Sequence, residues 1–143
     1  MPKTNEMEIR FSSQSINEAF VRVAISAFIS QLDPTVEALY DIKMAVSEAV
    51  TNAIIHGYES HKDGIVTAKC RYEDQTVFIE ISDQGKGISN IEEAMTPLYT
   101  TSIEEERAGL GFTVMQEMMD EVEVCSHPSE GTVVKMKKTL TKG

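Results

Sequence analysis

The chain has 143 residues, a formal net charge of −10 at pH 7 and a sequence pI near 4.7. This length fits a single core, so we expect one domain over residues 1–143. The acidic balance argues against broad binding to nucleic acid or to an anionic membrane, because both kinds of partner need clustered Lys and Arg.

The two cysteines, Cys70 and Cys125, form neither a CxxC motif nor a Cys/His cluster. The sequence therefore predicts reduced thiols, with neither a disulfide framework nor a structural zinc site. It also has no apolar run near the length of a membrane span, and its start lacks the pattern of a signal peptide. We expect a cytoplasmic protein.

The first element predicted is a short strand over residues 7–11, where apolar and polar residues alternate. A helix is expected over residues 15–30, with Ser15 and Glu18 as a capping box. Its apolar positions recur at helical spacing, at Ile16, Phe20, Val23, Ala24, Ala27 and Phe28.

A second helix should follow, with Asp33 as its cap and Pro34 at its first position, and should end at Gly57. Two segments with period-2 patterns, residues 64–73 and 76–85, then predict a β-hairpin.

After the hairpin, residues 91–94 predict a short acidic helix, and "MTPLYTTSIEEERAG" (residues 95–109) lacks an apolar period and predicts a loop. "LGFTVMQEMMDEV" predicts a helix, and "EVEVCSHP" and "GTVVKMKKTL" predict a closing hairpin. This order indicates an α+β fold, a two-layer sandwich in which a mixed, mostly antiparallel sheet carries helices on one face. The stripe of Met115, Met118 and Met119 is expected in the core.

Three polar residues of the second helix, Glu48, Asn52 and His56, lie four apart and therefore share one helical face. Such a stripe either lines a site or is an ordinary solvated face, and the stripe alone leaves both interpretations open. The apolar stripe of the same helix comprises Ala45, Val46, Ala49, Val50, Ala53 and Ile54.

Two glycine-containing segments follow the predicted strands. "SDQGKGIS" places Asp83 at the end of a strand, with Gly85 and Gly87 where the backbone must approach something closely or take positive φ. "RAGLGF" places Gly109 and Gly111 at the expected start of a helix, where free N–H groups suit phosphate. Neither segment has the dinucleotide fingerprint or the P-loop pattern, and either pair alone also fits an ordinary turn.

The chemistry of these parts is complementary. The Asp83 carboxylate is suited to accept a hydrogen bond from the exocyclic amine of adenine. Asn52 offers a carbonyl oxygen to Mg²⁺, and Glu48, one turn earlier, is suited to take a proton from an attacking hydroxyl or water.

At this point the sequence resembles the GHKL (Bergerat-fold) superfamily of ATPases and kinases. "EAVTNAIIHG" resembles its N box, "DQGKGI" and "GLGF" its two glycine boxes, and Gly131 with Thr132 its terminal adenine-site motif. The chain is also similar to the small bacterial anti-sigma factor serine kinases of endospore formers, through "VSEAVTNAIIHGY", "PLYTT" and "ERAGLGF". That resemblance implies a homodimer, formed through the sheet and the N-terminal region, that holds a sporulation sigma factor of the sigma-F type inactive. It also implies an ATP- and Mg²⁺-dependent serine kinase whose substrate is a STAS-domain anti-anti-sigma factor.

Within this resemblance, Glu48 and Arg107 match catalytic positions, Asn52 the Mg²⁺ ligand, and residues 95–108 the ATP lid. The ATP-binding positions that it implies are Asn52, Asp83, Gly85, Lys86, Gly87, Ile88, Thr100, Thr101, Ser102, Arg107, Ala108, Gly109, Leu110, Gly111, Phe112 and Thr132. Lys86 is either a phosphate contact or a solvated loop lysine. Arg22 is a candidate contact for the sigma factor, the alternative being an exposed arginine without a partner.

Two other functions stay open. One is a nucleotide-gated binding module with little catalysis; the presence of both Glu48 and Asn52 favours the enzyme, because a module that only binds nucleotide needs no acid beside the metal ligand. The other is a serine kinase with the same chemistry but different partner proteins, as in the general-stress sigma-B kinase or a stressosome switch kinase.

Overall fold

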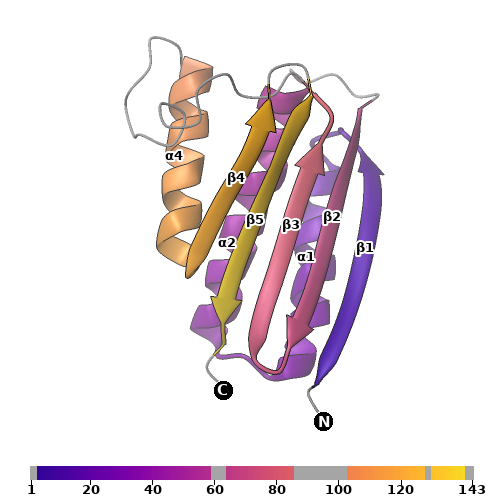
Figure 1. Ribbon diagram of the computed structural model, residues 1–143, viewed down its shortest axis with the longest axis vertical. Coiled ribbons are helices and arrows are strands. Elements are labelled where there is room, and N and C mark those ends of the chain that lie inside the picture. Colours follow the sequence, from indigo (N-terminus) through magenta and orange to yellow (C-terminus); the bar gives the residue numbers. More distant parts are fainter. Residues whose placement is uncertain (1–2, 59–63, 86–102, 128–129, 141–143) are drawn as a thin grey trace.

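Five strands form one sheet in the order β1-β2-β3-β5-β4, and all four pairings are antiparallel. In this computed structural model the described residues are 3–58, 64–85, 103–127 and 130–140. The strands are β1 (Thr4–Ser12), β2 (Ile65–Glu73), β3 (Thr76–Asp83), β4 (Glu121–His127) and β5 (Gly131–Thr139). Each strand that the sequence predicts is present (Figure 1).

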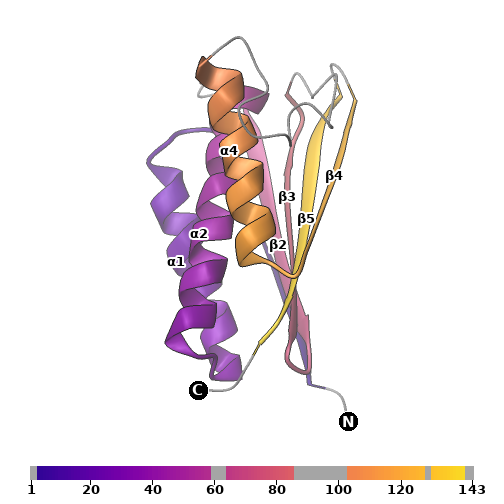
Figure 2. The ribbon, with the colours of Figure 1, turned by 90° about the vertical axis from the view of Figure 1, so that its left-hand side faces the viewer.

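The helices α1 (Asn17–Ile29), α2 (Val36–Asn52) and α4 (Ile103–Met118) lie together on one face of the sheet (Figure 2). Two short elements extend them: a 3₁₀ turn, η1 (Ser30–Leu32), and a π-helix, η2 (Ala53–Gly57), which continues α2 to the predicted end. The predicted two-layer α+β architecture is confirmed. None of the helices in the described ranges is both long and apolar enough to cross a membrane.

The core lies between the two layers. Alternate residues of β2 and β3 are buried, as a sheet with one covered face requires. The predicted apolar stripe of α2 is buried throughout, and Met115 and Met119 of α4 are buried with it, while Met118 packs against the core. Cys70 is also in the core, where burial raises the pKa of its thiol to about 12; Cys125 is exposed, and both thiols are free.

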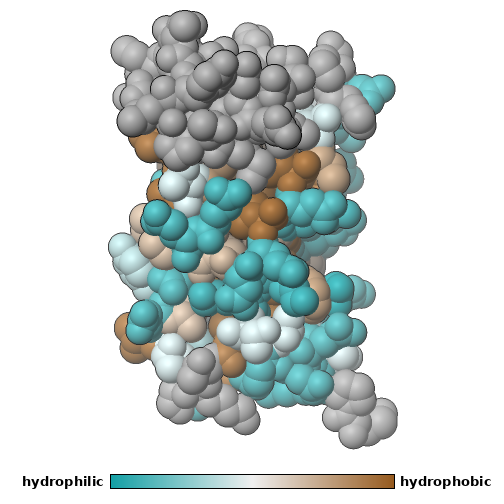
Figure 3. Space-filling model, turned by 60° about the vertical axis from the view of Figure 1, so that its left-hand side comes forward, coloured by the Kyte–Doolittle hydropathy of each residue, from teal (hydrophilic) through white to brown (hydrophobic). Residues whose placement is uncertain are grey.

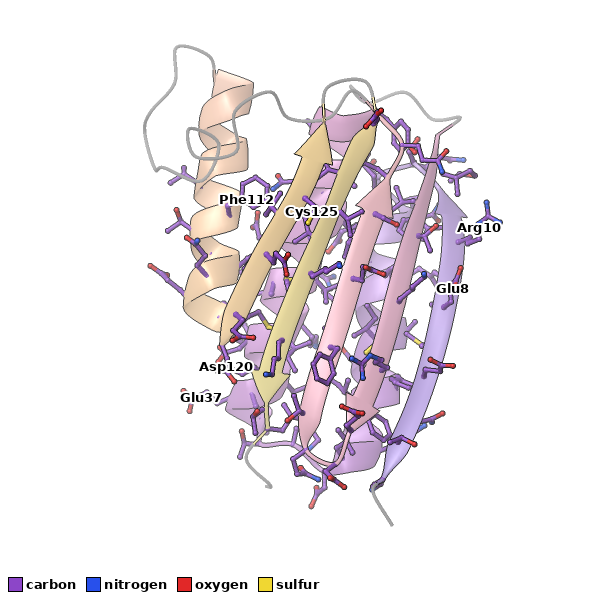
Figure 4. The ribbon with its side chains drawn as sticks, viewed as in Figure 1. Glu8, Arg10, Glu37, Phe112, Asp120 and Cys125 are labelled. Carbon is purple, nitrogen blue, oxygen red and sulfur yellow. The ribbon has the colours of Figure 1, made fainter. Side chains whose placement is uncertain are left out.

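The other face of the sheet is open and charged. One row of side chains in register crosses all five strands with alternating sign: Glu8, Lys69, Glu80, Lys135 and Glu123. Within it, the Lys69 ammonium lies 3.8 Å from the Glu80 carboxylate. Figure 4 shows this face toward the viewer, with Glu8 labelled on β1. Figure 3 shows the side of the molecule that carries α4 and β4. On that side, too, hydrophilic residues cover most of the described surface.

The predicted caps of the first two helices are wrong. The N-cap of α1 is Ile16, and no side chain caps it, so Ser15 and Glu18 form no capping box. The N-cap of α2 is Thr35, whose hydroxyl accepts a hydrogen bond from the Ala38 N–H at 3.0 Å. Asp33 instead takes a left-handed conformation, with φ of 51°, where the chain turns between η1 and α2.

The predicted apolar face of α1 is largely wrong as well. The residues that α1 buries are Val21, Ile25 and Ile29. Ile16, Phe20 and Val23 remain exposed at 77%, 58% and 61%, and Ala27 is also exposed. Apolar residues occupy two faces of this helix, so periodicity alone could not tell which face meets α2 and the sheet.

Residues 103–109, predicted as part of a loop, are the first turns of α4, and the helix ends at Met118 rather than at Val122. Three glutamates in the first turns suit the positive end of the helix dipole, but two glycines a few residues later weaken the local helical signal. Contacts with α2 hold this helix in place.

Candidate nucleotide-binding site

One group of predicted site residues lies where β3 ends. Asp83 is the last residue of β3 and faces Thr132 of β5 in register; their exposed fractions are 7% and 8%. The Gly85 N–H donates to Asp83 Oδ1 at 2.9 Å. Burial raises the pKa of Asp83, and hydrogen bonds from the backbone N–H groups of Gly85 and Thr132 offset part of that rise. The result is a buried carboxylate held in place by backbone donors.

Gly131 makes the close approach of β5 to this carboxylate possible. Its φ is +88°, a conformation that residues with a side chain rarely adopt. A Cβ at this position would also collide with the Asp83 carbonyl oxygen, and it would lie 2.7 Å from the Gln84 Cα. The predicted GT motif therefore has a physical basis: the glycine lets the strand turn against β3, and the threonine that follows faces Asp83.

The second group lies where α2 crosses α4, beneath Gly111. A Cβ on Gly111 would lie 3.0 Å from both Glu48 Oε2 and Asn52 Nδ2, and 3.3 Å from Asn52 Oδ1. The polar stripe of α2 thus points at the backbone of α4, and Glu48 and Asn52 are half-buried. These two residues therefore face another helix rather than open solvent, and their role in a site stays a prediction. The side chain of His56, the third member, is outside the described part.

The Glu48 carboxyl has a raised pKa, first because of burial and second because of the negative charge of Glu18 on α1. Glu18 also pairs with Arg22, whose Nη1 lies 3.4 Å from Glu18 Oε1. Arg22, predicted as a partner contact, therefore already has an ionic partner within α1. A role for Glu18 near the site was not predicted, since the sequence places it on another helix.

The Asn52 amide is suited to a metal–phosphate group. Its Nδ2 is buried without a hydrogen-bond partner among the described residues, although a buried amide donor normally has one. A phosphate oxygen could accept from this nitrogen while the amide oxygen binds Mg²⁺, a cation that prefers oxygen ligands. The space above the amide is open only because residue 111 has no side chain.

Tyr58 was not predicted as a site residue, yet it connects the strands beside Asp83. Its hydroxyl donates to the Ile65 carbonyl at 2.6 Å and accepts from the Gln84 N–H at 2.7 Å. Gln84 follows Asp83 directly, so Tyr58 fixes the first residue of the segment that leaves β3. No motif in the sequence signals this bridge, because it joins residues 26 positions apart.

Several predicted ATP-binding residues are outside the described part of the chain: Lys86, Gly87, Ile88, Thr100, Thr101 and Ser102. Residues 95–102 of the predicted lid are also outside it. Arg107, Ala108 and Gly109 are described as part of α4, and their side chains are not.

The prediction that "RAGLGF" lies at the start of a helix is wrong. Gly109 and Gly111 lie in the interior of α4 rather than at its start, and only the first turn of a helix has free N–H groups. Leu110 is exposed at 43%, and Phe112 is buried, pointing from α4 toward the sheet (Figure 4). What Gly111 provides is room for Glu48 and Asn52, and Phe112 anchors the helix.

Comparisons with known proteins show the family of the chain. Residues 11–138 match the family described as histidine kinase-like ATPase domain. The anti-sigma F factor of Thermoanaerobacter sp. (strain X514) is 59% identical over 140 residues, which covers 98% of this chain and 97% of that protein. The anti-sigma F factor of Bacillus velezensis (strain DSM 23117 / BGSC 10A6 / LMG 26770 / FZB42) is 51% identical over 138 residues, covering 96% and 94%.

Two solved structures share the fold. The crystal structure of the RsbU and RsbW domains of Rv1364c from Mycobacterium tuberculosis matches with a TM-score of 0.71 and 18% identity, over 97% of this chain and 33% of that one. The blue-light activated histidine kinase EL346 of Erythrobacter litoralis matches with a TM-score of 0.57 and 20% identity, over 86% and 41%. The antiparallel fold, the family match and the near-full-length relatives together show that the chain belongs to the anti-sigma F factors, within the family of histidine kinase-like ATPase domains.

Proposed function

We propose that this chain is an ATP-dependent protein serine kinase that also restrains a sigma factor of the sigma-F type. The observation that carries the proposal is the convergence of Glu48 and Asn52 beneath Gly111, next to η2, which contacts the two strands that carry Asp83 and Thr132. An acid, an amide and a buried carboxylate at one end suit a nucleotide bound with its base on the sheet and its phosphates by α2 and α4.

In this proposal Asp83 and Thr132 bind adenine, and the Asn52 carbonyl oxygen is a ligand of Mg²⁺. Bound Mg²⁺ would supply positive charge that stabilises the phosphates during transfer. Glu48 accepts the proton of the serine hydroxyl as that oxygen bonds to the γ-phosphorus of ATP and the bond from this phosphorus to ADP breaks. Its raised pKa suits the role, because a general base works best when its pKa is near the working pH. Arg107, on the predicted lid, offsets charge on the transferring phosphate.

The proposed protein substrate is a serine on a STAS-domain anti-anti-sigma factor. The proposed contact region for sigma factor and antagonist is the exposed side of α1. On that side Phe20 and Val23 expose apolar surface, which is typical of a protein interface when it is contiguous. Arg22 points away from them, toward Glu18 in the preceding turn. The sigma-F assignment rests on the names of the relatives, which favours it over the sigma-B or stressosome circuit.

We also propose that the chain forms a homodimer through its sheet and N-terminal region. The charged row on the open face supports this proposal. When the open faces of two copies are packed together with an offset of one strand, each charge of the overlapping parts of the row meets an opposite charge on the other copy. In such an arrangement Lys69 of one copy faces Glu80 of the other. Molecular mass in solution, measured by light scattering at low and high salt, tests this point; a monomer at micromolar concentration contradicts it.

The kinase assay uses the purified chain with Mg-[γ-³²P]ATP and a STAS-domain antagonist, followed by phosphoamino-acid analysis. We expect phosphoserine on the antagonist. Glu48→Gln should lower transfer by roughly 10²–10⁴-fold while ATP affinity changes only a few-fold. Glu37→Gln is the matched control: Glu37, labelled in Figure 4, is an exposed glutamate in the first turn of the same helix, about three turns before Glu48.

Three results would separate the candidate functions. Phosphoserine that depends on Glu48 supports the kinase. Tight ATP binding without transfer supports the nucleotide-gated module, in which ATP changes only the affinity for the sigma factor. Transfer that Glu48→Gln leaves unchanged contradicts the role assigned to this carboxyl.

A further inference from the structure

Asp83 and Thr132 belong to a row of three polar side chains that also includes Ser126. Asp83 of β3 faces Thr132 of β5, and Thr132 faces Ser126 of β4 in the same register. Residues directly opposite each other in an antiparallel pair point to the same face of the sheet. All three therefore lie on the face that the helices cover, and Ser126 is half-buried beside the buried Thr132.

The hydrogen bonds of Ser126 determine the direction of the Thr132 hydroxyl. Ser126 Oγ donates to the Gly131 carbonyl at 2.9 Å, and it lies 2.8 Å from Thr132 Oγ1. A serine hydroxyl has a single proton. Because that proton goes to Gly131, the bond between the two hydroxyls uses the proton of Thr132. Thr132 Oγ1 then has only lone pairs to offer to any other group.

The Asp83 carboxylate also offers only lone pairs to a ligand. An ionised carboxylate only accepts hydrogen bonds, and Asp83 already accepts one from the Gly85 N–H at 2.9 Å. The end of the sheet thus presents two acceptors side by side, Asp83 and the Thr132 hydroxyl. Two acceptors suit a group with N–H donors and disfavour a carbonyl oxygen, which would face lone pairs at both contacts.

We propose that Ser126 is a specificity-determining positioning residue. By holding the proton of Thr132, it makes the pocket select a 6-amino purine over a 6-oxo purine. This inference rests on the proposed binding of ATP at Asp83 and Thr132, and it adds a residue on β4 that no motif marks. Ser126 acts through Thr132 and does not touch the base.

The test compares the dissociation constants of ATP and inosine triphosphate, whose purine has a carbonyl oxygen at position 6. Both are measured by calorimetry on the full chain with Mg²⁺. Wild-type protein should prefer ATP. Ser126→Ala frees the Thr132 proton to point at the purine, so the ATP-to-ITP preference should fall by about tenfold, a factor of the size of one hydrogen bond.

Two variants separate this effect from general damage. Ser126→Thr keeps a hydroxyl on β4 and should retain the wild-type preference. Cys125→Ala changes the neighbouring residue, which is exposed on the open face, and should also retain it. Thermal unfolding of each variant measures whether the fold is kept, and the ratio of two affinities cancels any loss of folded protein.

The outcomes are distinct for the two proposals. A preference that is unchanged in Ser126→Ala overturns the inference while the proposed function stands. A wild-type protein that binds ATP and ITP equally also overturns the inference alone. A wild-type protein that binds neither nucleotide overturns the proposed function, and the inference with it.

Discussion

Gly111→Ala tests whether the contact between α2 and α4 is the functional centre. The added Cβ would lie 3.0 Å from Glu48 Oε2 and from Asn52 Nδ2. This is about 0.5 Å closer than a favourable non-bonded contact, so the two side chains must move by roughly that distance. A displacement of 1 Å can reduce catalysis about 10²-fold, so half of that distance predicts a loss of phosphoryl transfer of about tenfold.

Stability should change little in the same variant. Replacing a glycine in a helix interior by alanine stabilises the helix by about 0.5–1 kcal/mol, and the close contact offsets a similar amount. We therefore expect a Tm within about 5 °C of wild type. The assay is phosphoryl transfer to the antagonist, with Gln116→Ala, an exposed position of the same helix, as the control. Wild-type transfer in a folded Gly111→Ala protein would refute the argument, because it would show that Glu48 and Asn52 can move without effect.

Three further predictions concern charge and positioning. Asp83→Asn should raise the free energy of unfolding of the ligand-free protein at pH 7 and abolish adenine selectivity. The raised pKa of Asp83 gives the sign, because the ionised carboxylate destabilises the fold at pH values above that pKa. The difference in free energy of unfolding between variant and wild type should therefore shrink when denaturation is measured at lower pH. Glu18→Gln should lower the pKa of Glu48, which moves the rise of the pH–rate profile for transfer to lower pH; an unmoved profile would contradict the coupling. Tyr58→Phe removes the bridge between Ile65 and Gln84, so it should cost about 1 kcal/mol of stability and weaken nucleotide binding, whereas Tyr40→Phe, at an exposed site on α2, should do neither.

The fold could be predicted because its strands and α2 have strong local patterns. β2 and β3 alternate cleanly, and the apolar stripe of α2 has one possible buried face. α1 has apolar residues on two faces, so only its packing decides that Val21 is buried and Phe20 exposed. The start of α4 was missed because Gly109 and Gly111 weaken a helix whose stability comes from contact with α2.

The candidate site also contains residues that could be predicted from the sequence and residues that could not. Glu48, Asn52 and Asp83 could be predicted, since residue type, spacing and position at a strand end mark them. Ser126, Tyr58 and Glu18 could not, because each acts through a partner on another element. Their roles depend on strand register, on a bridge between strands and on the packing of α1 against α2.

Three unfavourable features lie among the predicted site residues. Asp83 and Glu48 are carboxyls whose charged forms are disfavoured by burial, and the Asn52 amide nitrogen is buried without a hydrogen-bond partner among the described residues. Each lowers the stability of the fold when no ligand is bound. An amino group at Asp83 and a metal–phosphate group at Asn52 would relieve two of them, while the third, Glu48, becomes useful only when a hydroxyl must lose its proton. Under the proposed function, this cost in stability is that of a site arranged for its substrate before the substrate binds.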